Sequence, residues 1–432
     1  MENYEKEINE ILGKSKENSR PPILNKLAIV GIVAFIIIFV YASGFLNFAP
    51  KFTASFNAAW PGALNVHFSA PVSGDLEVSY SNGTMVYSGP INSFGVTHLL
   101  LNPGFYELVA GADFTYSLVP DKFNRTIFAT GIASYGIISN SYQLSSYQIQ
   151  TSEVLGLASI SKITAYNATI SGGLSPSTAS LQLNVVANVS YDGNKTQVFW
   201  LQDVAQFDTS SGLYYFDDNV WNSSAQGANI SSSAVNGSGG VLAYTTSKGA
   251  TQNVYAYATS NKISTDLPLN LTLIIKTSIV DDHPIISFGY SQGFTIIDGK
   301  VAYNAHFYDN VSLNVNATKI SIIITPYYVA PSFIPYDAEF VFGGPGNGAS
   351  TYFNSLNADL SLLYYNDTLN SLSYFPSYYN FGEDTAEAAD NLQTSPIAGS
   401  FANISVVTGA PNYGYASSTS SNQHSKKKSE LS

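Results

Sequence analysis

Cysteine is absent from the 432 residues, and charged residues are scarce. Without thiols the chain can form neither a disulfide framework nor a thiolate metal site. The five histidines are scattered and show no ligand spacing such as HExxH, which argues against a zinc centre. Only 11% of the residues are charged, and the formal net charge of -12 argues against nucleic acid as a partner. We therefore expect no cofactor and no nucleic-acid function.

The shortage of charge also suits an acidic exterior. Below about pH 3 most carboxylates are neutral. A chain with only 18 Lys and Arg residues then avoids strong self-repulsion. A surface kept soluble by Asn, Ser and Tyr side chains at any pH explains the same composition, so both interpretations stay open here.

One long uncharged run lies near the N-terminus, between Lys26 and Lys51. Its residues 27–48 are numerous enough to cross a hydrocarbon core of about 30 Å as a helix. Basic residues precede the run and only Lys51 follows it closely, so the positive-inside rule places the N-terminus in the cytoplasm. We expect a cytoplasmic leader over 1–26, a single-pass membrane anchor over 27–48 and an extracellular remainder. The alternative is a signal peptide that is cleaved after Ala42.

The rest of the chain has the composition of a β protein. Its 30 Tyr and 25 Phe residues, with abundant Val, Ile and Thr, favour strands. Short apolar runs between turn-forming residues predict a small β-sandwich of immunoglobulin-like type over 52–120, as a spacer or adhesion module. A second, larger β region over 128–409 contains long alternating segments typical of sheet-on-sheet packing. The clearest predicted strands are 64–68, 75–80, 106–109, 180–191, 197–207, 269–279 and 319–325.

Three further features concern the C-terminal half and the surface. The segment 381–393 (FGEDTAEAADNLQ) predicts the one helix of the chain, with Asp384 or Thr385 as its N-cap. The polar tail over 410–432 is expected to be disordered. N-x-S/T sequons recur outside the apolar run and fit N-glycans on an extracellular surface, for example at Asn188, Asn222 and Asn316.

Two segments concentrate carboxylates among apolar and aromatic residues: 199–222 (FWLQDVAQFDTSSGLYYFDDNVWN) and 335–348 (PYDAEFVFGGPGNG). An ionised carboxylate in such a setting is costly unless it is paired, protonated or used in chemistry. Strand alternation places Asp203 on one face of the first segment and Gln202 on the other. In the second segment, Asp337 and Glu339 share a face.

Peptide hydrolysis without a Ser or Cys nucleophile or a metal needs an acid and a base. Asp203 could share a proton with Asp337 or Glu339. Alternatively, Glu339 could act as general acid and base, with Gln202 stabilising the oxyanion. The two arrangements place opposite faces of the strand in the cleft, so at most one is right, and we favour the second.

The adjacent pair Asp217 and Asp218 is a weaker candidate. In a strand these two side chains point to opposite faces and cannot share a proton. A calcium site built from them and loop carbonyls is conceivable, but the chain lacks an EF-hand-like ligand spacing.

Several segments together resemble the thermopsin family of acid peptidases and follow one another in that family's order. They cover most of residues 128–409, and the two carboxylate segments are the most specific. The resemblance implies an acid endopeptidase at the surface of a thermoacidophilic archaeon, acting on unfolded proteins or peptides and preferring large hydrophobic residues around the cut. No D-T/S-G tripeptide of the pepsin-like proteases is present. The segments are 147–166, 179–186, 199–222, 287–290, 336–348 and 381–387.

The chain departs from the family at one position. The family's opening motif is GIADYG, whereas this chain has GIASYG over 131–136, with Ser134 in place of Asp. If that Asp serves catalysis, Ser134 implies an inactive or altered homologue. An inactive one would be a structural or adhesion protein of the cell surface. Glutamic peptidases, which carry a Gln/Glu pair on a β-sandwich, provide a fold-level analogy for Gln202 and Glu339. The expectation is an all-β, membrane-anchored acid endopeptidase that forms no covalent intermediate.

Overall fold

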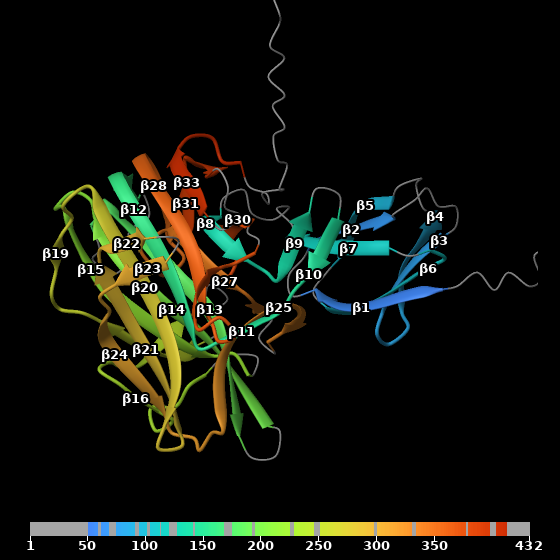
Figure 1. Cartoon of the computed structure of the whole chain (residues 1–432), viewed down its shortest axis with the longest axis horizontal. Coiled ribbons are helices and arrows are strands. Elements are labelled where there is room, and N and C mark those ends of the chain that lie inside the picture. Colours follow the sequence, from blue (N-terminus) through green and yellow to red (C-terminus); the bar gives the residue numbers. More distant parts are fainter. Residues whose placement is uncertain are drawn as a thin grey trace, which may run out of the picture. The chain divides into compact units, whose positions relative to one another are not determined.

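The computed structural model of the chain is built of β-strands (Figure 1). The expected leader and membrane anchor lie outside the described residues, as does the tail beyond residue 412. Within the described part, no helix is long and apolar enough to span a membrane. The all-β class is confirmed there. The described residues are 51–58, 62–68, 75–90, 95–101, 104–112, 114–120, 128–140, 143–167, 175–191, 195–224, 229–245, 251–297, 300–330, 334–376, 379–397 and 403–412.

The N-terminal strands form two small sheets that share one apolar core. Alternate residues of β2, β3 and β6 are buried in it, among them Leu64, Val78 and Leu108. This is the arrangement of a β-sandwich, and its immunoglobulin-like type stays a prediction. One sheet has the order β1 (Phe52–Ala58), β6 (Gly104–Ala110), β3 (Asp75–Tyr80), β4 (Met85–Pro90), and the other β5 (Gly95–Leu101), β2 (Gly62–Phe68), β7 (Phe114–Pro120).

The larger region contains a 12-stranded sheet that carries the residues of interest. Its main path is β17 (Gly240–Thr245), β18 (Thr251–Ala258), β15 (Leu213–Asn222), β14 (Lys195–Asp208), β13 (Thr178–Tyr191), β27 (Ala338–Gly343), β8 (Ala129–Ser134), β30 (Tyr379–Gly382). The strands β11 (Ile149–Thr151), β19 (Ile263–Ser264), β25 (Lys319–Val329) and β26 (Pro335–Tyr336) pair beside this path.

A 10-stranded sheet packs against one face of the 12-stranded sheet. Its main path is β16 (Val235–Asn236), β24 (His306–Leu313), β21 (His283–Gln292), β20 (Leu269–Val280), β12 (Glu153–Tyr166), β28 (Ser350–Asn366), β33 (Asn403–Thr408), β32 (Leu392–Pro396), with β29 (Ser371–Tyr374) and β31 (Ala388–Asp390) beside it. Two further two-stranded sheets join β9 (Ile137–Asn140) to β10 (Gln143–Ser146) and β22 (Phe294–Ile297) to β23 (Lys300–Tyr303).

Strand alternation separates the two faces of the 12-stranded sheet. The inner face supplies apolar side chains such as Leu183, Leu201 and Phe340 to the core between the sheets. Each such side chain contributes roughly 1.5–3 kcal/mol by leaving water. The outer face carries the intervening polar residues, and the candidate site is built there.

The predicted helix over 381–393 is wrong. Residues 379–382 form β30 and pair with β8, and residues 388–390 form β31, which pairs in parallel with β28. Between them, the backbone N–H groups of Glu383 and Asp384 donate to the Glu339 carboxylate. The N–H groups at the start of the segment thus donate to a side chain of a neighbouring strand. This tertiary contact outweighs the helix propensity of the sequence.

Candidate active site

A row of polar residues crosses the outer face of the 12-stranded sheet. Asn219 in β15 pairs with Gln202 in β14, Gln202 with Asn184 in β13, and Asn184 with Glu339 in β27. Paired residues in neighbouring strands present their side chains on the same face. The Asn219 amide donates to Gln202 Oε1 at 3.1 Å, and Asn184 donates to Glu339 Oε2 at 3.2 Å.

Glu339 is fully buried at the end of this row. Its Oε1 accepts hydrogen bonds from the Tyr135 hydroxyl at 3.1 Å and from the backbone N–H groups of Glu383 at 2.6 Å and Asp384 at 3.2 Å. A Cβ on Gly382 would lie 2.6 Å from Glu339 Oε2, so only glycine lets the chain approach this closely. Glu339 therefore holds the 382–384 segment against the sheet.

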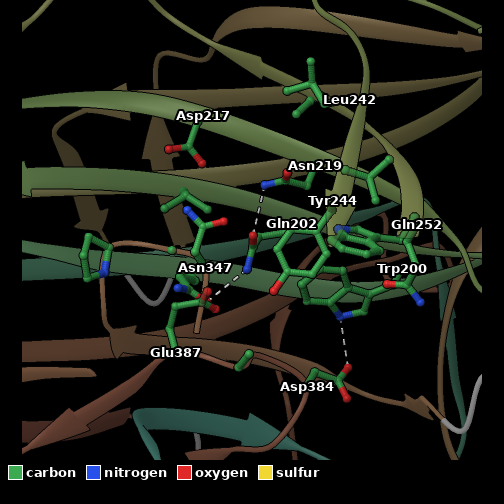
Figure 2. Close-up of a pocket in the computed structure, with 18 of the residues that line it drawn as sticks. Trp200, Gln202, Asp217, Asn219, Leu242, Tyr244, Gln252, Asn347, Asp384 and Glu387 are labelled. Atoms are coloured by element: carbon green, nitrogen blue, oxygen red, sulfur yellow. Dashed lines mark hydrogen bonds between the residues drawn. The ribbon is translucent and has the colours of Figure 1, made fainter. Parts of the chain in front are cut away.

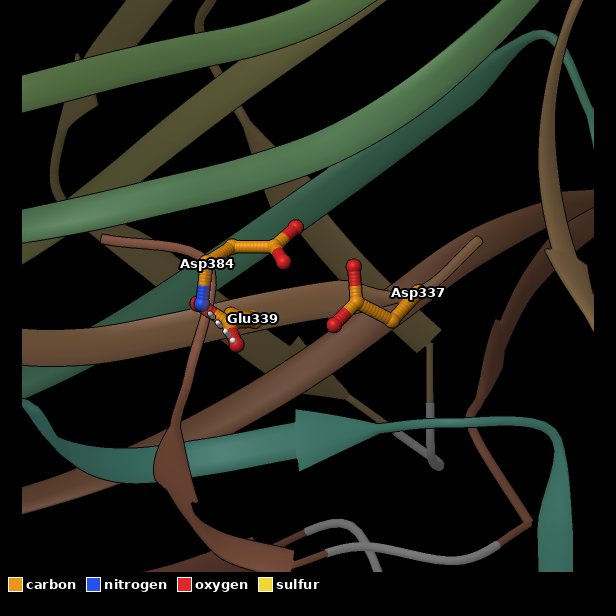
Figure 3. Close-up of side chains that lie close together, drawn as sticks. All are labelled: Asp337, Glu339 and Asp384. Carbon is orange, nitrogen blue, oxygen red and sulfur yellow. Dashed lines mark hydrogen bonds between the residues drawn. The ribbon is translucent and has the colours of Figure 1, made fainter. Parts of the chain in front are cut away.

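That segment brings Asp384 beside Asp337 and Glu339 (Figure 3). Carboxylate oxygens of the three residues lie within 4.8 Å of one another. Asp337 comes from the junction of β26 and β27 and is fully buried, whereas Asp384 is only partly buried. Trp200 Nε1 donates to Asp384 Oδ2 at 3.1 Å and orients that carboxylate.

The three carboxyl groups favour their protonated forms. Burial raises the pKa of Asp337 well above its usual range, and the Asp384 and Glu339 carboxylates raise it further. Burial and Glu339 also raise the pKa of Asp384, while the Asp337 carboxyl group and the hydrogen bond from Trp200 lower it. Burial raises the pKa of Glu339, opposed by the donors already named. Neither Asp337 oxygen accepts or donates a recorded hydrogen bond among the described residues, and its carboxyl group lies beside that of Asp384. Two carboxyl groups this close resist ionising together, so the pair can share one proton.

Asp384 opens onto a cleft of about 510 Å³ on the outer face of the sheet (Figure 2). Gln202 also lines this cleft, and its Nε2 donates to Gln182 Oε1 at 3.0 Å. Trp221, Leu242, Tyr244 and other residues of β14, β15, β17 and β18 form an apolar wall. The cleft therefore combines a carboxyl pair, amide donors and aromatic surface, which suits a peptide.

The structure places the predicted residues on two faces. Gln202, Asp337 and Glu339 lie on the outer face, although β13 separates Gln202 from Glu339 by two strand spacings, about 9.6 Å. Asp203 lies on the inner face, where its Oδ2 accepts from the Ile274 N–H at 3.1 Å and its Oδ1 contacts the Tyr308 hydroxyl at 2.6 Å. Asp203 is therefore not brought together with Asp337 or Glu339.

Asp217 and Asp218 also lie on opposite faces, as alternation predicted. Asp217 lines the cleft, whereas Asp218 pairs with Asp203 on the inner face and is fully buried. Neither Asp218 oxygen accepts a hydrogen bond from a described residue. Burial and the Asp309 and Asp203 carboxylates raise the pKa of Asp218 to about 10.

Ser134 lies away from the carboxyl trio. It pairs with Ala338 in β27, so its side chain points to the face opposite Glu339, where its hydroxyl contacts that of Tyr147. The departure from the family motif therefore leaves Asp337, Glu339 and Asp384 untouched.

Among the described residues, the carboxylates of this trio lie close enough together to bind one metal ion. Oxygen ligands of this kind suit a hard cation. However, Glu339 already accepts four hydrogen bonds from the protein, which use the lone pairs that a cation would need.

Sequence reasoning missed Asp384 because its acidic neighbours look like the first turn of a helix. The signal that could have found it is FGEDTAE over 381–387, which already resembled the family. The role of Trp200 as a donor to Asp384 carried no sequence signal, because 184 residues separate the two.

Comparison with known proteins identifies the family of the chain. The thermopsin family model matches residues 116–392, which is more than half of the chain. The chain belongs to the thermopsin family. Thermopsin from Sulfolobus acidocaldarius is 37% identical over 287 residues, covering 64% of this chain and 81% of that protein. Membership of the thermopsin family supports an acid protease.

Proposed function

We propose that the protein is an acid endopeptidase, held in the cell membrane by residues 27–48, with its N-terminus in the cytoplasm and the residues after the anchor outside. The observation that carries the proposed activity is the position of Asp384, which reaches the cleft while its carboxyl group faces buried Asp337. Unfolded proteins or peptides are the substrates. N-glycans on exposed sequons such as Asn316 would fit the same location.

The reaction needs one base, one acid and an oxyanion donor. In a pair that shares one proton, Asp337 keeps the proton and Asp384 is ionised. The Asp384 carboxylate then takes a proton from a water molecule as the water oxygen bonds to the scissile carbonyl carbon. The resulting oxyanion accepts a hydrogen bond from Gln202 Nε2, whose second hydrogen is not used by Gln182. When the C–N bond breaks, Asp384 returns the proton to the amine nitrogen, and the products are a carboxylic acid and an amine.

The other two carboxyl groups support Asp384. Protonated Asp337 donates to Asp384 and stabilises the ionised form that the first step requires. Glu339 fixes the backbone at Asp384, because its carboxylate accepts hydrogen bonds from the N–H groups of Glu383 and Asp384. In this proposal Asp384 is the catalytic residue, and Glu339 and Asp337 position and tune it.

The test compares the full chain with its Asp384→Asn variant. Both are held in detergent micelles at pH 2–3 and elevated temperature with an unfolded protein substrate. We expect kcat to fall by about 10²–10⁴-fold, the typical loss when an acid–base group is removed. Asp367→Asn, which changes an exposed carboxylate outside the cleft, should cleave like the wild type.

Two outcomes would contradict the proposal in different ways. Equal cleavage by the wild type and Asp384→Asn would keep an acid protease and discard this site. No cleavage by wild-type protein shown to be folded would favour the inactive structural or adhesion protein instead.

A further inference from the structure

Polar side chains on the outer face of the 12-stranded sheet form one continuous chain of hydrogen bonds. The chain begins at Ser180 in β13, whose Oγ donates to the Gly344 carbonyl oxygen at 2.6 Å. Gln182 Nε2 donates to Ser180 Oγ at 2.8 Å, and Gln202 Nε2 donates to Gln182 Oε1 at 3.0 Å. Asn219 Nδ2 completes the chain by donating to Gln202 Oε1 at 3.1 Å (Figure 2). The chain thus connects the turn after β27 with the cleft.

The backbone carbonyl of Gly344 sets the direction of this chain. A carbonyl oxygen can only accept, so it uses the one hydroxyl proton of Ser180. Because Ser180 Oγ can then only accept, Gln182 must turn its amide nitrogen to Ser180 and its oxygen to Gln202. Gln202 in turn must direct its nitrogen to Gln182 and its oxygen to Asn219. A reversed chain would place two acceptor oxygens against each other at Ser180, which is costly in a buried site.

The direction of the chain decides which group Gln202 offers to the cleft. An amide nitrogen carries two hydrogens, and Gln182 accepts one of those on Gln202. Because Gln202 lines the cleft, the second hydrogen is available to a bound peptide. In a reversed chain the carbonyl oxygen of Gln202 would take the place of this N–H group, and an oxygen repels an oxyanion. The polarity of the chain therefore determines whether Gln202 can stabilise developing negative charge.

Every group in the chain is neutral, which suits an enzyme that works in acid. Hydroxyl and amide side chains keep their charge state where carboxyl groups titrate. Ser180 and Gln182 are buried, so water does not compete for their hydrogen bonds. A Cβ on Gly343 would lie 3.3 Å from Gln182 Nε2, so the glycine leaves room for this amide. The chain therefore keeps one direction across the acidic pH range.

We propose that Ser180 is a positioning residue, which orients the Gln202 amide through Gln182 so that an N–H group faces the oxyanion. The inference rests on the proposed function, which gives Gln202 the role of oxyanion donor. Ser180 exerts this effect from a distance. Gln202 pairs with Asn184, which lies four residues after Ser180 in β13. At about 3.4 Å per residue, this separates Ser180 from Gln202 by roughly 14 Å along the strand.

The first test follows the Gln202 amide directly and needs no cleavage. The full chain, labelled with nitrogen-15 glutamine, is held in detergent micelles at pH 3, and the Gln202 side-chain NMR signal is identified by its absence in Gln202→Met. In Ser180→Ala, the Gln182 nitrogen would lose its acceptor, and a buried N–H group without a partner is rarer in native structures than such a carbonyl. The chain should therefore reverse and shift the Gln202 signal. Thr178→Val, which removes a buried hydroxyl of β13 outside the chain, should leave the signal in place.

The second test is a double-mutant cycle on cleavage of an unfolded protein substrate at pH 2–3. Gln202→Met should lower kcat by about 10²–10³-fold, the usual loss for one oxyanion donor. Ser180→Ala should lower kcat about tenfold and change KM less than about twofold, because the oxyanion forms only in the transition state. Added to Gln202→Met, it should lower kcat by less than about twofold more. Thr178→Val should cleave like the wild type.

The cycle separates positioning from a structural role, because Ser180 also holds the turn after β27 through Gly344. A purely structural role would raise KM, and independent effects at distant sites would add in the double variant. Either result, wild-type kcat in Ser180→Ala, or an unshifted Gln202 signal would overturn the inference. If Ser180→Ala does not fold, Gln182→Met, which breaks the same chain one step later, replaces it in both tests.

Failure of the inference is distinguishable from failure of the proposed function. Absence of cleavage by folded wild-type protein, or wild-type cleavage by Asp384→Asn, contradicts the proposed function. Wild-type cleavage by Gln202→Met removes the oxyanion role of Gln202 and overturns the inference with it. An unshifted Gln202 signal in Ser180→Ala contradicts the inference alone, because that measurement does not involve cleavage.

Discussion

At the scale of single residues, the contacts of the Tyr308 hydroxyl bear on the protonation state of Asp203. The Tyr308 oxygen lies 2.6 Å from Asp203 Oδ1 and 2.9 Å from the Asp217 carbonyl oxygen. A phenol carries one proton and cannot donate fully to both acceptors. If Asp203 is protonated, it donates to Tyr308, and Tyr308 donates to the carbonyl. Burial raises the pKa of Asp203 well above its usual range, and this also favours the protonated acid.

Asp203→Asn should therefore preserve the whole network. The amide nitrogen can donate to Tyr308 and the amide oxygen can accept from the Ile274 N–H, as the protonated acid does. We expect the free energy of unfolding to change by less than about 1 kcal/mol at pH 3. Activity should persist, because Asp203 lies on the inner face. Asp203→Ala, which leaves Ile274 and Tyr308 unsatisfied, should lose about 1–3 kcal/mol. Loss of activity in a folded Asp203→Asn protein would restore Asp203 as a catalytic candidate.

At the scale of elements, alternation made the strands predictable and left the site incomplete. The predicted strands 180–191 and 197–207 lie within β13 and β14, because their alternating side chains fill one core. The same alternation placed Gln202 and Asp203 on opposite faces. Alternation does not say which strands become neighbours, so it could not show that β13 separates Gln202 from Glu339. Alternation also could not predict that the segment after β30 lies over the sheet.

The position of the segment after β30 depends on Glu339, and this gives a second prediction, about elements. In Glu339→Gln the amide oxygen can still accept from the Glu383 and Asp384 N–H groups, and Asn184, whose Oδ1 has no partner among the described residues, can turn to accept from the new amide. We expect this variant to retain activity within about tenfold, while Glu339→Ala loses about 10²-fold or more because Asp384 is misplaced.

Hydrogen exchange separates this positioning role from direct catalysis. The amides of Glu383 and Asp384 should stay protected in Glu339→Gln and exchange faster in Glu339→Ala. If Glu339→Gln keeps the protection but loses activity as fully as Glu339→Ala, Glu339 itself is the acid or base, as the sequence first suggested.

At the scale of the whole molecule, the buried acids of the described residues outnumber the described basic groups that pair with them. Asp203, Asp218, Asp337 and Glu339 are fully buried in the region of the two large sheets. The salt bridge recorded among the described residues joins Lys276 to Glu153 and involves none of them. Their carboxyl groups therefore favour protons over cations, which suits a chain with few Lys and Arg residues. The fold and the proposed acid activity thus both depend on protonated carboxyl groups.

This protonated state predicts that the fold is most stable in acid and weakens toward neutral pH. A carboxyl group whose pKa is raised by folding stabilises the native state fully below its unfolded pKa, near 4, and loses that contribution as pH rises toward its folded pKa. The folded pKa is about 10 for Asp218 and about 7 for Asp217. Asp218 alone should therefore lower the free energy of unfolding by about 1.4 kcal/mol for each pH unit above 4.

Denaturant unfolding of the full chain between pH 2 and pH 8 measures this slope directly. We expect the midpoint to fall steadily above about pH 4, with the fall made shallower by Asp218→Asn, which cannot ionise. Asp367→Asn, whose carboxylate is exposed in the native state, should leave the slope unchanged. A midpoint that rises toward pH 7 would mean that the buried acids are ionised in the native state. In that case the proton sharing proposed for Asp337 and Asp384 would lose its physical basis, because the same burial raises the pKa values of both groups.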